Sequence, residues 1–126
     1  MERTTQNFNP VLDKKLKCTC CGEGQLSISA FMLVETVRMH FGAPVTILSG
    51  PRCRPYNRKV GGAAKSEHLI LDGEDVEAVD FTVAGQTPTA VYLYLKSLPY
   101  ANLLGLGKYK TFVHADTRGY NARWQG

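Results

Sequence analysis

Two histidines in this sequence lie close to carboxylates, and their spacing suggests metal chemistry. His68 opens an acidic stretch, H-L-I-L-D-G-E-D-V-E-A-V-D, that ends at Asp80, and His114 precedes Asp116 in F-V-H-A-D-T-R. Two imidazoles and one carboxylate are a sufficient ligand set for a catalytic zinc ion with water at the fourth position. A zinc ion held in this way lowers the pKa of the bound water and polarises a substrate carbonyl. The sequence therefore contains a candidate hydrolytic site.

Strand spacing would bring His114 and its neighbouring carboxylate to one side of the chain. Alternate residues of a β-strand share a face, so Phe112, His114 and Asp116 point the same way if this run is a strand. The third histidine, His40, falls near the C-terminal end of an expected helix, where a protonated imidazole complements the helix dipole. From the residues alone, the competing interpretation is that His68 and His114 are ordinary surface residues, and it stays open.

Hydrophobic periodicity predicts helices and strands in alternation. A cap at Ser27 or Ser29, followed by apolar residues every three or four positions, predicts a helix that ends at Gly42. A Thr cap and a Pro in the first turn predict another helix over residues 87–98. Four runs have the composition of strands: 44–50, 76–83, 101–109 and 110–117.

The segments between these elements are rich in residues that favour turns. Residues 51–66 contain many Pro, Gly and basic side chains, which favours an irregular loop, and a short helical turn is expected after Asn9-Pro10. A chain of 126 residues fits one domain with one core, so we expect residues 1–126 to form a single domain. The order of its elements predicts an α+β fold with a small antiparallel sheet and flanking helices.

Composition limits the classes of partner without selecting one. The 15 Lys and Arg residues against 11 Asp and Glu residues give a net charge of +4, which favours an anionic partner such as nucleic acid or bacterial cell wall. No run approaches the ~20 apolar residues of a membrane-spanning helix, so no membrane partner is expected. The N-terminal run M-E-R-T-T-Q-N-F-N-P lacks the apolar core of a secretory signal. We therefore expect a protein made in the cytoplasm without a signal peptide.

Four cysteines form a separate group. Cys18, Cys20 and Cys21 lie in K-C-T-C-C-G-E-G, and Cys53 lies in G-P-R-C-R-P-Y-N. The pattern is C-x-C-C with a distant fourth cysteine. Zinc ribbons instead carry pairs of cysteines in C-x-x-C spacing. Free thiols in a reducing compartment are the favoured interpretation, ahead of one disulfide from the cluster to Cys53 and of a metal site. We accordingly expect no second, structural zinc ion.

A series of ordered motifs resembles the zinc D-alanyl-D-alanine carboxypeptidase-like peptidases (peptidase family M15), which share a fold with the hedgehog signalling domain. The motifs are S-G-x-R, Y-N, V-G-G, S-x-H, A-x-D and a late F-V-H-x-D-T-R, and the similarity runs from about Phe8 to Trp124. The resemblance implies a hedgehog/DD-peptidase-like α+β fold and a zinc ion held by His68, Asp80 and His114. Within the family, the sequence looks like a small subgroup common in bacteriophages and prophages.

The choice of aspartate in this ligand set depends on an insertion. The usual family pattern, H-x-x-G-x-A-x-D, leads to Asp75, whereas the signature A-x-D followed by an apolar residue lies at 78–81 and contains Asp80. A loop lengthens between fixed ends at little entropic cost. We therefore interpret residues 71–76 as part of an insertion and favour Asp80 over Asp75. Three more acidic residues are then expected in a solvated turn: Asp72, Glu74 and Glu77.

The general base is where the sequence departs from the family pattern. Related branches of the family carry an acidic residue three positions before the last histidine, but this position is Thr111, which cannot accept the proton. Asp116 is the candidate base because it faces the same way as His114. Its alternative role is to orient an imidazole or to pair with Arg118.

Three residues are expected to meet the substrate. Arg52 matches the arginine of S-G-x-R, and its guanidinium can hold a substrate carboxylate or carbonyl in a bidentate manner. Ser66 of S-x-H is expected to hydrogen-bond locally or to the substrate, and Tyr109 is expected either to line the cleft or to pack against its neighbours.

The resemblance implies a zinc-dependent peptidase that hydrolyses the peptide stems of bacterial peptidoglycan, as a D,D-carboxypeptidase or an endolysin-type endopeptidase. It would act as a monomer at the cell wall, delivered by a phage or carried in a virion. The first alternative is a non-catalytic zinc-bearing module that binds cell wall or protein, which Thr111 favours. The second is a basic nucleic-acid-binding domain, which is disfavoured because the basic residues are scattered and share no aromatic stacking face.

Overall fold

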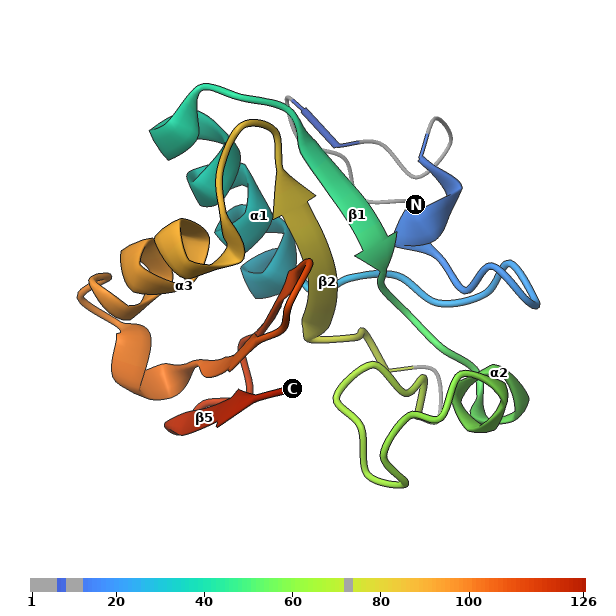
Figure 1. Ribbon diagram of the computed structural model, residues 1–126. Helices are drawn as coiled ribbons and strands as arrows, with labels where there is room; N and C mark the ends of the chain where they lie inside the picture. Colours follow the sequence, from blue (N-terminus) through green and yellow to red (C-terminus); the bar gives the residue numbers. More distant parts are fainter. Residues whose placement is uncertain (1–6, 9–12, 72–73) are drawn as a thin grey trace.

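The computed structural model describes residues 7–8, 13–71 and 74–126 (Figure 1). Asp72 of the acidic stretch lies outside the described residues, whereas the short helical turn expected after Asn9-Pro10 is present as a 3-10 turn at residues 14–16. The helices are α1 (Ile28–Phe41), α2 (Arg54–Lys59) and α3 (Pro88–Lys96), with 3-10 turns η1 (Lys14–Leu16) and η2 (Ala101–Leu103). The strands are β1 (Val45–Ser49), β2 (Ala78–Val83), β3 (Gly105–Lys108), β4 (Val113–Asp116) and β5 (Ala122–Gln125).

The five strands form one sheet in the order β1-β2-β4-β3-β5. Every neighbouring pair is antiparallel except β3 and β5, which run parallel. After β4 the chain passes the start of β3 and pairs with its other edge, because both Asp116 and Ala122 lie opposite Gly105. The predicted α+β class with flanking helices is confirmed. The parallel fifth strand, which the sequence patterns missed, makes the sheet mixed.

Alternation along β2 and β4 gives the sheet one apolar and one polar face. Val79, Phe81, Val113 and Ala115 are buried in the hydrophobic core together with apolar residues of α1 and α3. The residues between them point to the opposite face, because successive side chains of a strand alternate. The register then pairs Asp80 with His114 on that second face.

Helices α1 and α3 begin and end where capping chemistry predicts. The Ser27 hydroxyl accepts a hydrogen bond from the Ala30 N–H at 3.1 Å, and α1 ends at Gly42 in the left-handed region with φ 59°. The Thr87 hydroxyl caps α3 in the same way, 3.1 Å from the Ala90 N–H. Figure 1 shows both helices beside the sheet and α2 apart from them, next to the loop that leads to β2. None of the described helices has the length and apolar character needed to cross a bilayer.

The segment 51–66, which the sequence suggested would be irregular, contains the short helix α2, so that prediction is wrong at residues 54–59. Cys53 is the N-cap and a Pro occupies the first turn, where its missing N–H costs nothing. The loop after α2 then turns tightly around Asn57, whose side-chain amide donates to the Ala63 carbonyl at 2.9 Å. A Cβ on Gly62 would collide with the Asn57 side chain, so the second glycine of V-G-G is required by space.

Phe81 tests how strongly the core holds the strand that carries Asp80. Its side chain is 0% exposed. We expect Phe81→Ala to lower the free energy of unfolding by about 3–5 kcal/mol, through lost burial and a cavity. The matched control is Leu93→Ala on α3, where the side chain is 56% exposed and the expected change is within about 0.5 kcal/mol. Urea unfolding of both variants at equal metal content measures the difference, and equal losses would contradict this description of the core.

Candidate metal centre

Three separate parts of the chain bring His68, Asp80 and His114 together. Asp80 lies within β2, and the antiparallel register places His114 of β4 directly opposite. His68 lies in the loop between α2 and β2. Its carbonyl accepts a hydrogen bond from the Arg52 N–H at 2.7 Å, and its own N–H donates to the Ser66 hydroxyl at 3.1 Å. The loop histidine is therefore fixed at both sides of its backbone, and all three side chains are buried.

The three ligand atoms form a small triangle. His68 Nε2 lies 3.1 Å from Asp80 Oδ1 and 3.2 Å from His114 Nδ1, and His114 Nδ1 lies 2.9 Å from Asp80 Oδ1. Ligand atoms about 2.0–2.1 Å from a tetrahedral zinc ion are roughly 3.3–3.4 Å apart. The triangle is thus only a few tenths of an ångström tighter than a zinc site requires, and these residues fit such an ion.

The remaining ring nitrogens define the tautomers. His68 Nδ1 lies 2.8 Å from the Gly50 carbonyl, and His114 Nε2 lies 2.6 Å from Asp116 Oδ2. Both partners are acceptors, so these nitrogens carry the hydrogen atoms. The lone pairs of His68 Nε2 and His114 Nδ1 are then directed at the Asp80 carboxylate, which also offers only lone pairs. Three acceptors at one buried point require a cation between them.

Without a metal ion, a proton on His114 is the available cation. Burial lowers the pKa of His114, but its hydrogen bonds to Asp116 and Asp80 outweigh burial and raise it. Burial raises the pKa of Asp80, but hydrogen bonds from His114 and His68 outweigh it and hold this pKa well below its usual range. Burial raises the pKa of Asp116 too, and hydrogen bonds from Arg118 and His114 lower it to about 2. Both carboxylates therefore stay ionised beside the imidazoles.

Asp116 lies behind His114 and not in the cleft. Its side chain is 0% exposed. One carboxylate oxygen contacts His114 Nε2, while Arg118 Nε and Nη2 each donate to the carboxylate at 2.7 Å. With both oxygens used in this way, the carboxylate is not open to a water molecule in the cleft, contrary to the base role that the sequence suggested. The geometry matches the alternative role, in which Asp116 orients the His114 imidazole.

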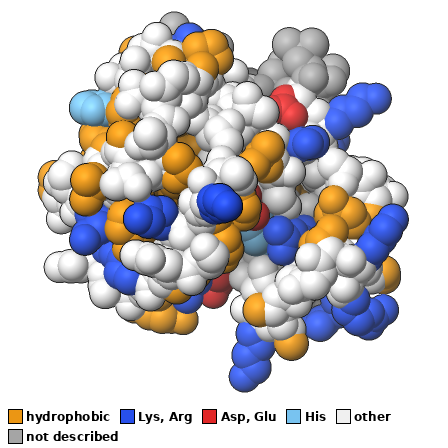
Figure 2. Space-filling model, viewed as in Figure 1, with side chains coloured by type: hydrophobic (Ala, Val, Ile, Leu, Met, Phe, Trp, Pro, Cys, Tyr) orange, Lys and Arg blue, Asp and Glu red, His pale blue; other side chains and the backbone are white. Residues whose placement is uncertain are grey.

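An open cleft of about 510 Å³ exposes the ligand triangle on one side. Histidine atoms are visible at the bottom of a hollow in Figure 2, beside basic and acidic atoms. Residues of the sheet, of the α2–β2 loop and of the connections β1–α2, β3–β4 and β4–β5 line this cleft: Arg52, Val60, Gly61, Gly62, Ala63, Lys65, Ser66, Glu67, His68, Asp80, Tyr109, Phe112, His114, Arg118 and Trp124. All three residues expected at the substrate, Arg52, Ser66 and Tyr109, are among them.

Arg52 connects the cleft to the ligand set. Its Nη2 donates to Asp80 Oδ2 at 3.2 Å, Nε donates to the Ser49 hydroxyl at 3.0 Å, and Nη1 donates to Asn57 Oδ1 at 3.2 Å. These bonds leave Asp80 Oδ1 directed at the two imidazoles. They use three of the five N–H donors of a guanidinium, so two donors remain for an oxygen in the cleft.

Aromatic residues make the opposite wall of the cleft. Tyr109 stacks on Phe112 with ring centroids 4.5 Å apart, and its hydroxyl accepts a hydrogen bond from Trp124 Nε1 at 2.9 Å. The Trp124 ring lies 5.0 Å from the His114 ring. A Cβ on Gly107 would collide with the Trp124 indole, so the second glycine of G-L-G makes room for this wall.

Sequence reasoning did not assign Glu67 and Trp124 to the site, and it named Arg118 only as an alternative partner of Asp116. The spacing of G-L-G was a usable signal, because glycines at alternate positions beside a histidine-bearing strand indicate that bulky groups pack there. A Cβ on Gly105 would meet Asp116 and Arg118. Glu67 could have been proposed from its place next to His68 in S-E-H.

The other acidic and histidine candidates lie elsewhere. Asp75 is not part of the metal-ligand group, whereas Asp80 is. Glu77 accepts a hydrogen bond from the Ser27 hydroxyl at 2.8 Å and another from Thr117. His40, at the end of α1, stacks on Tyr94 with ring centroids 3.7 Å apart.

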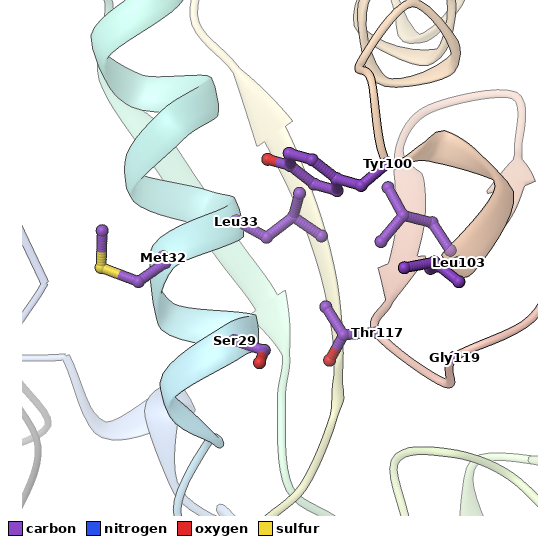
Figure 3. A pocket seen from close by; sticks show the side chains of 8 residues that line it. Ser29, Met32, Leu33, Tyr100, Leu103, Thr117 and Gly119 are labelled. Carbon is purple, nitrogen blue, oxygen red and sulfur yellow. The ribbon is translucent and has the colours of Figure 1, made fainter.

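A second hollow, of about 340 Å³, lies between α1 and the segments around η2 and the end of β4 (Figure 3). Its described lining is mainly apolar and contains no histidine, cysteine or carboxylate: Ser29, Met32, Leu33, Tyr100, Leu103, Leu104, Thr117 and Gly119. Metal-dependent chemistry is therefore assigned to the first cleft.

Two imidazoles and one carboxylate that face an open cleft are the ligand set of a catalytic metal site, whereas structural zinc sites are closed by four protein ligands. The family model described as Peptidase M15 matches residues 7–116, so the chain belongs to this family. Membership implies hydrolase activity of the metallopeptidase type, typically dependent on zinc, for which the His68–Asp80–His114 group is a candidate site. No curated protein and no solved structure matches the chain significantly.

Metal content tests the ligand set. We expect His68→Ala, His114→Ala and Asp80→Asn each to lose one equivalent of zinc, because two ligands hold the ion much more weakly than three. Asp75→Asn is the matched control and should keep its zinc. Elemental analysis of the purified variants measures this. Loss in Asp75→Asn together with retention in Asp80→Asn would show that the insertion was placed wrongly.

Asp116→Asn tests the positioning of His114. We expect zinc affinity to fall roughly 10–100-fold, because the carboxylate that fixes the ring and raises its basicity is lost. Competition with a chromogenic chelator measures the affinity, and Glu74→Gln on the surface is the control. Unchanged affinity in Asp116→Asn would contradict the positioning role.

Proposed function

We propose that this protein is a zinc-dependent peptidase that hydrolyses the peptide stems of bacterial peptidoglycan. The observation that carries the proposal is the convergence of His68 Nε2, Asp80 Oδ1 and His114 Nδ1 at the base of an open cleft. Membership of the Peptidase M15 family supports a peptidoglycan-type substrate. The net charge of +4 is also compatible with an anionic cell-wall polymer.

The bound zinc ion would supply Lewis acidity and a water of lowered pKa. The chain supplies orientation. The Gly50 carbonyl and the Asp116 carboxylate each accept a hydrogen bond from the N–H of one ligand imidazole. The lone pair of the other ring nitrogen is then directed at the metal position. Arg118 in turn holds Asp116 through two N–H donors. This arrangement keeps the ligand geometry fixed while the substrate changes shape.

Charge in the buried part of the site favours a substrate with a carboxylate. Asp80 is paired with Arg52 and Asp116 with Arg118, so these four side chains carry no net charge together. A divalent ion adds two positive charges that this set does not compensate. The two remaining N–H donors of Arg52 are suited to a carboxylate or carbonyl oxygen of the stem peptide. Tyr109 and Trp124 offer an apolar wall on which its short side chains can pack.

Glu67 is our candidate for the proton acceptor. Among the residues that the structure describes, it is the one carboxylate besides Asp80 that lines the cleft. Arg118 lines the same cleft, and its pKa is raised mainly by its hydrogen bonds to Asp116 and to a smaller extent by Glu67. General bases in such sites are carboxylates that reach the water or substrate proton directly. The Ser66 hydroxyl accepts a hydrogen bond from the His68 backbone N–H, so Ser66 is assigned a role in positioning His68.

The cleft is compatible with either removal of a terminal D-alanine or cleavage within the stem. The site of action that we propose is the bacterial cell wall, reached as a phage product, and the protein would act as a monomer. One observation favours the second candidate function, a non-catalytic zinc-bearing module that binds cell wall or protein. Thr111 replaces the acidic residue that related branches carry, and it lines a different, small hollow.

Digestion of purified peptidoglycan separates the two functions. The zinc-loaded protein should release muropeptides or free D-alanine, identified by mass, and a chelated sample should release neither. Glu67→Gln should keep its zinc yet lose roughly 10²–10⁴-fold in turnover, the usual scale for a positioned proton acceptor. Glu74→Gln is the matched surface control. Tight zinc binding without cleavage of any muropeptide would contradict the peptidase and leave the binding module.

A further inference from the structure

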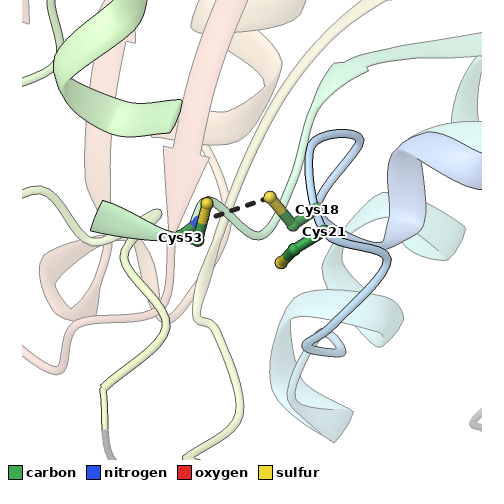
Figure 4. Close-up of side chains that lie close together, drawn as sticks. All are labelled: Cys18, Cys21 and Cys53. Atoms are coloured by element: carbon green, nitrogen blue, oxygen red, sulfur yellow. Dashed lines mark hydrogen bonds between the residues drawn. The ribbon is translucent and has the colours of Figure 1, made fainter. Parts of the chain in front are cut away.

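A second group of metal-ligating side chains lies outside the cleft, where the N-terminal segment meets the start of α2. The Sγ atoms of Cys18, Cys21 and Cys53 all lie within 4.8 Å of one another (Figure 4). Cys18 is buried, Cys53 is half-buried and Cys21 is exposed. None of the three lines the cleft that holds His68.

The local backbone brings two of these sulfurs to the same side. Cys18 and Cys21 have C-x-x-C spacing and are followed by Gly22. This cysteine pair was overlooked when the segment was described as C-x-C-C. The Gly22 N–H donates to the Cys18 carbonyl at 2.7 Å, and the Cys18 N–H donates to the Glu23 carbonyl at 2.9 Å. Gly22 has φ 74°, in the left-handed region that glycine adopts without strain. The turn is therefore closed, with Cys18 at its base and Cys21 directly before its glycine.

Backbone donors converge on one of the sulfurs. The Cys53 N–H lies 3.3 Å from Cys18 Sγ, the dashed line in Figure 4. Burial raises the pKa of the Cys18 thiol, but the backbone N–H groups of Cys53, Cys21 and Cys20 outweigh burial and lower it. Such donors stabilise a thiolate, which is the form that binds a metal. A neutral thiol in the core needs no such set of donors.

We propose that Cys18, Cys21 and Cys53 hold a structural zinc ion and that Cys20 is its fourth ligand. Cys20 is not among the three close sulfurs, but it is exposed and lies between Cys18 and Cys21 in the same turn, so a local shift would bring its thiol into the group. Four thiolates close the coordination shell, which is typical of a structural and not a catalytic zinc. A single disulfide would join two sulfurs and leave the closeness of the others unexplained.

This ion would tie the N-terminal segment to the loop that carries Arg52. Cys53 directly follows Arg52, whose guanidinium holds Asp80. The same two segments already pack tightly, because a Cβ on Gly50 would lie 2.7 Å from the Lys15 carbonyl. Gly50 is the residue whose carbonyl orients His68. The cysteine site would therefore stabilise the backbone on which one side of the catalytic cleft is built.

Cobalt substitution distinguishes this site from the histidine site. Reduced protein should bind about two zinc ions per chain. Loading with Co²⁺ should produce a sulfur-to-metal charge-transfer band in the near ultraviolet, which nitrogen and oxygen ligands do not give. Cys21→Ser, at an exposed position that leaves the core intact, and Cys53→Ser should each lose one zinc equivalent and most of this band. His68→Ala should lose the other equivalent and keep the band.

Each alternative result has a distinct meaning. One zinc per chain that is unaffected by Cys21→Ser and Cys53→Ser, without a charge-transfer band, would overturn the cysteine site. In protein purified without reductant, failure to regain four titratable thiols on chelation would overturn it in favour of a disulfide. A band of unchanged intensity in Cys20→Ser would overturn the assignment of the fourth ligand. None of these readouts depends on peptidase activity, so failure of the proposed function would be seen separately.

Discussion

Three lone pairs directed at one buried point are the constraint on which the rest of the structure depends. His68 Nε2, His114 Nδ1 and Asp80 Oδ1 lie 2.9–3.2 Å apart, and their outer partners leave none of them a hydrogen atom to share. Buried acceptors without a donor are unfavourable. A metal ion, or in its absence a proton on His114, resolves the conflict. Gly50 and Asp116 keep the three lone pairs facing one another, because their hydrogen bonds fix the orientation of the two imidazoles.

The sheet is built around this arrangement. Its alternation sends Val79 and Phe81 into the core and Asp80 to the cleft, so one strand stabilises the fold and carries a ligand. Glycines at 105 and 107 of β3 leave the space that Asp116, Arg118 and Trp124 occupy. Two buried carboxylates are each paired with an arginine, which offsets the cost of removing their charges from water.

Much of this arrangement could be predicted from the sequence because it follows from local rules. Strand alternation placed His114 and Asp116 on one face, and the A-x-D signature selected Asp80, the aspartate that the structure brings to the histidines. Helix α2 was missed because Pro and Gly in the segment indicate a loop, and β5 because A-R-W-Q has no β-branched residue and no buried position that alternates with exposed ones. The pairing of Asp116 with Arg118 was among the alternatives that the sequence offered, but the burial of Asp116 depends on pairing with β3, which no local pattern contains.

Anomalous diffraction from crystals of the zinc-loaded protein, recorded at the zinc edge, tests the central claim most directly. The account predicts a peak about 2.0–2.1 Å from His68 Nε2, His114 Nδ1 and Asp80 Oδ1, with Asp116 bonded to the far nitrogen of His114. A peak bound through His114 Nε2 would contradict the account, because the ring would then be turned away from Asp80. So would the absence of any peak at these three residues in protein that binds zinc.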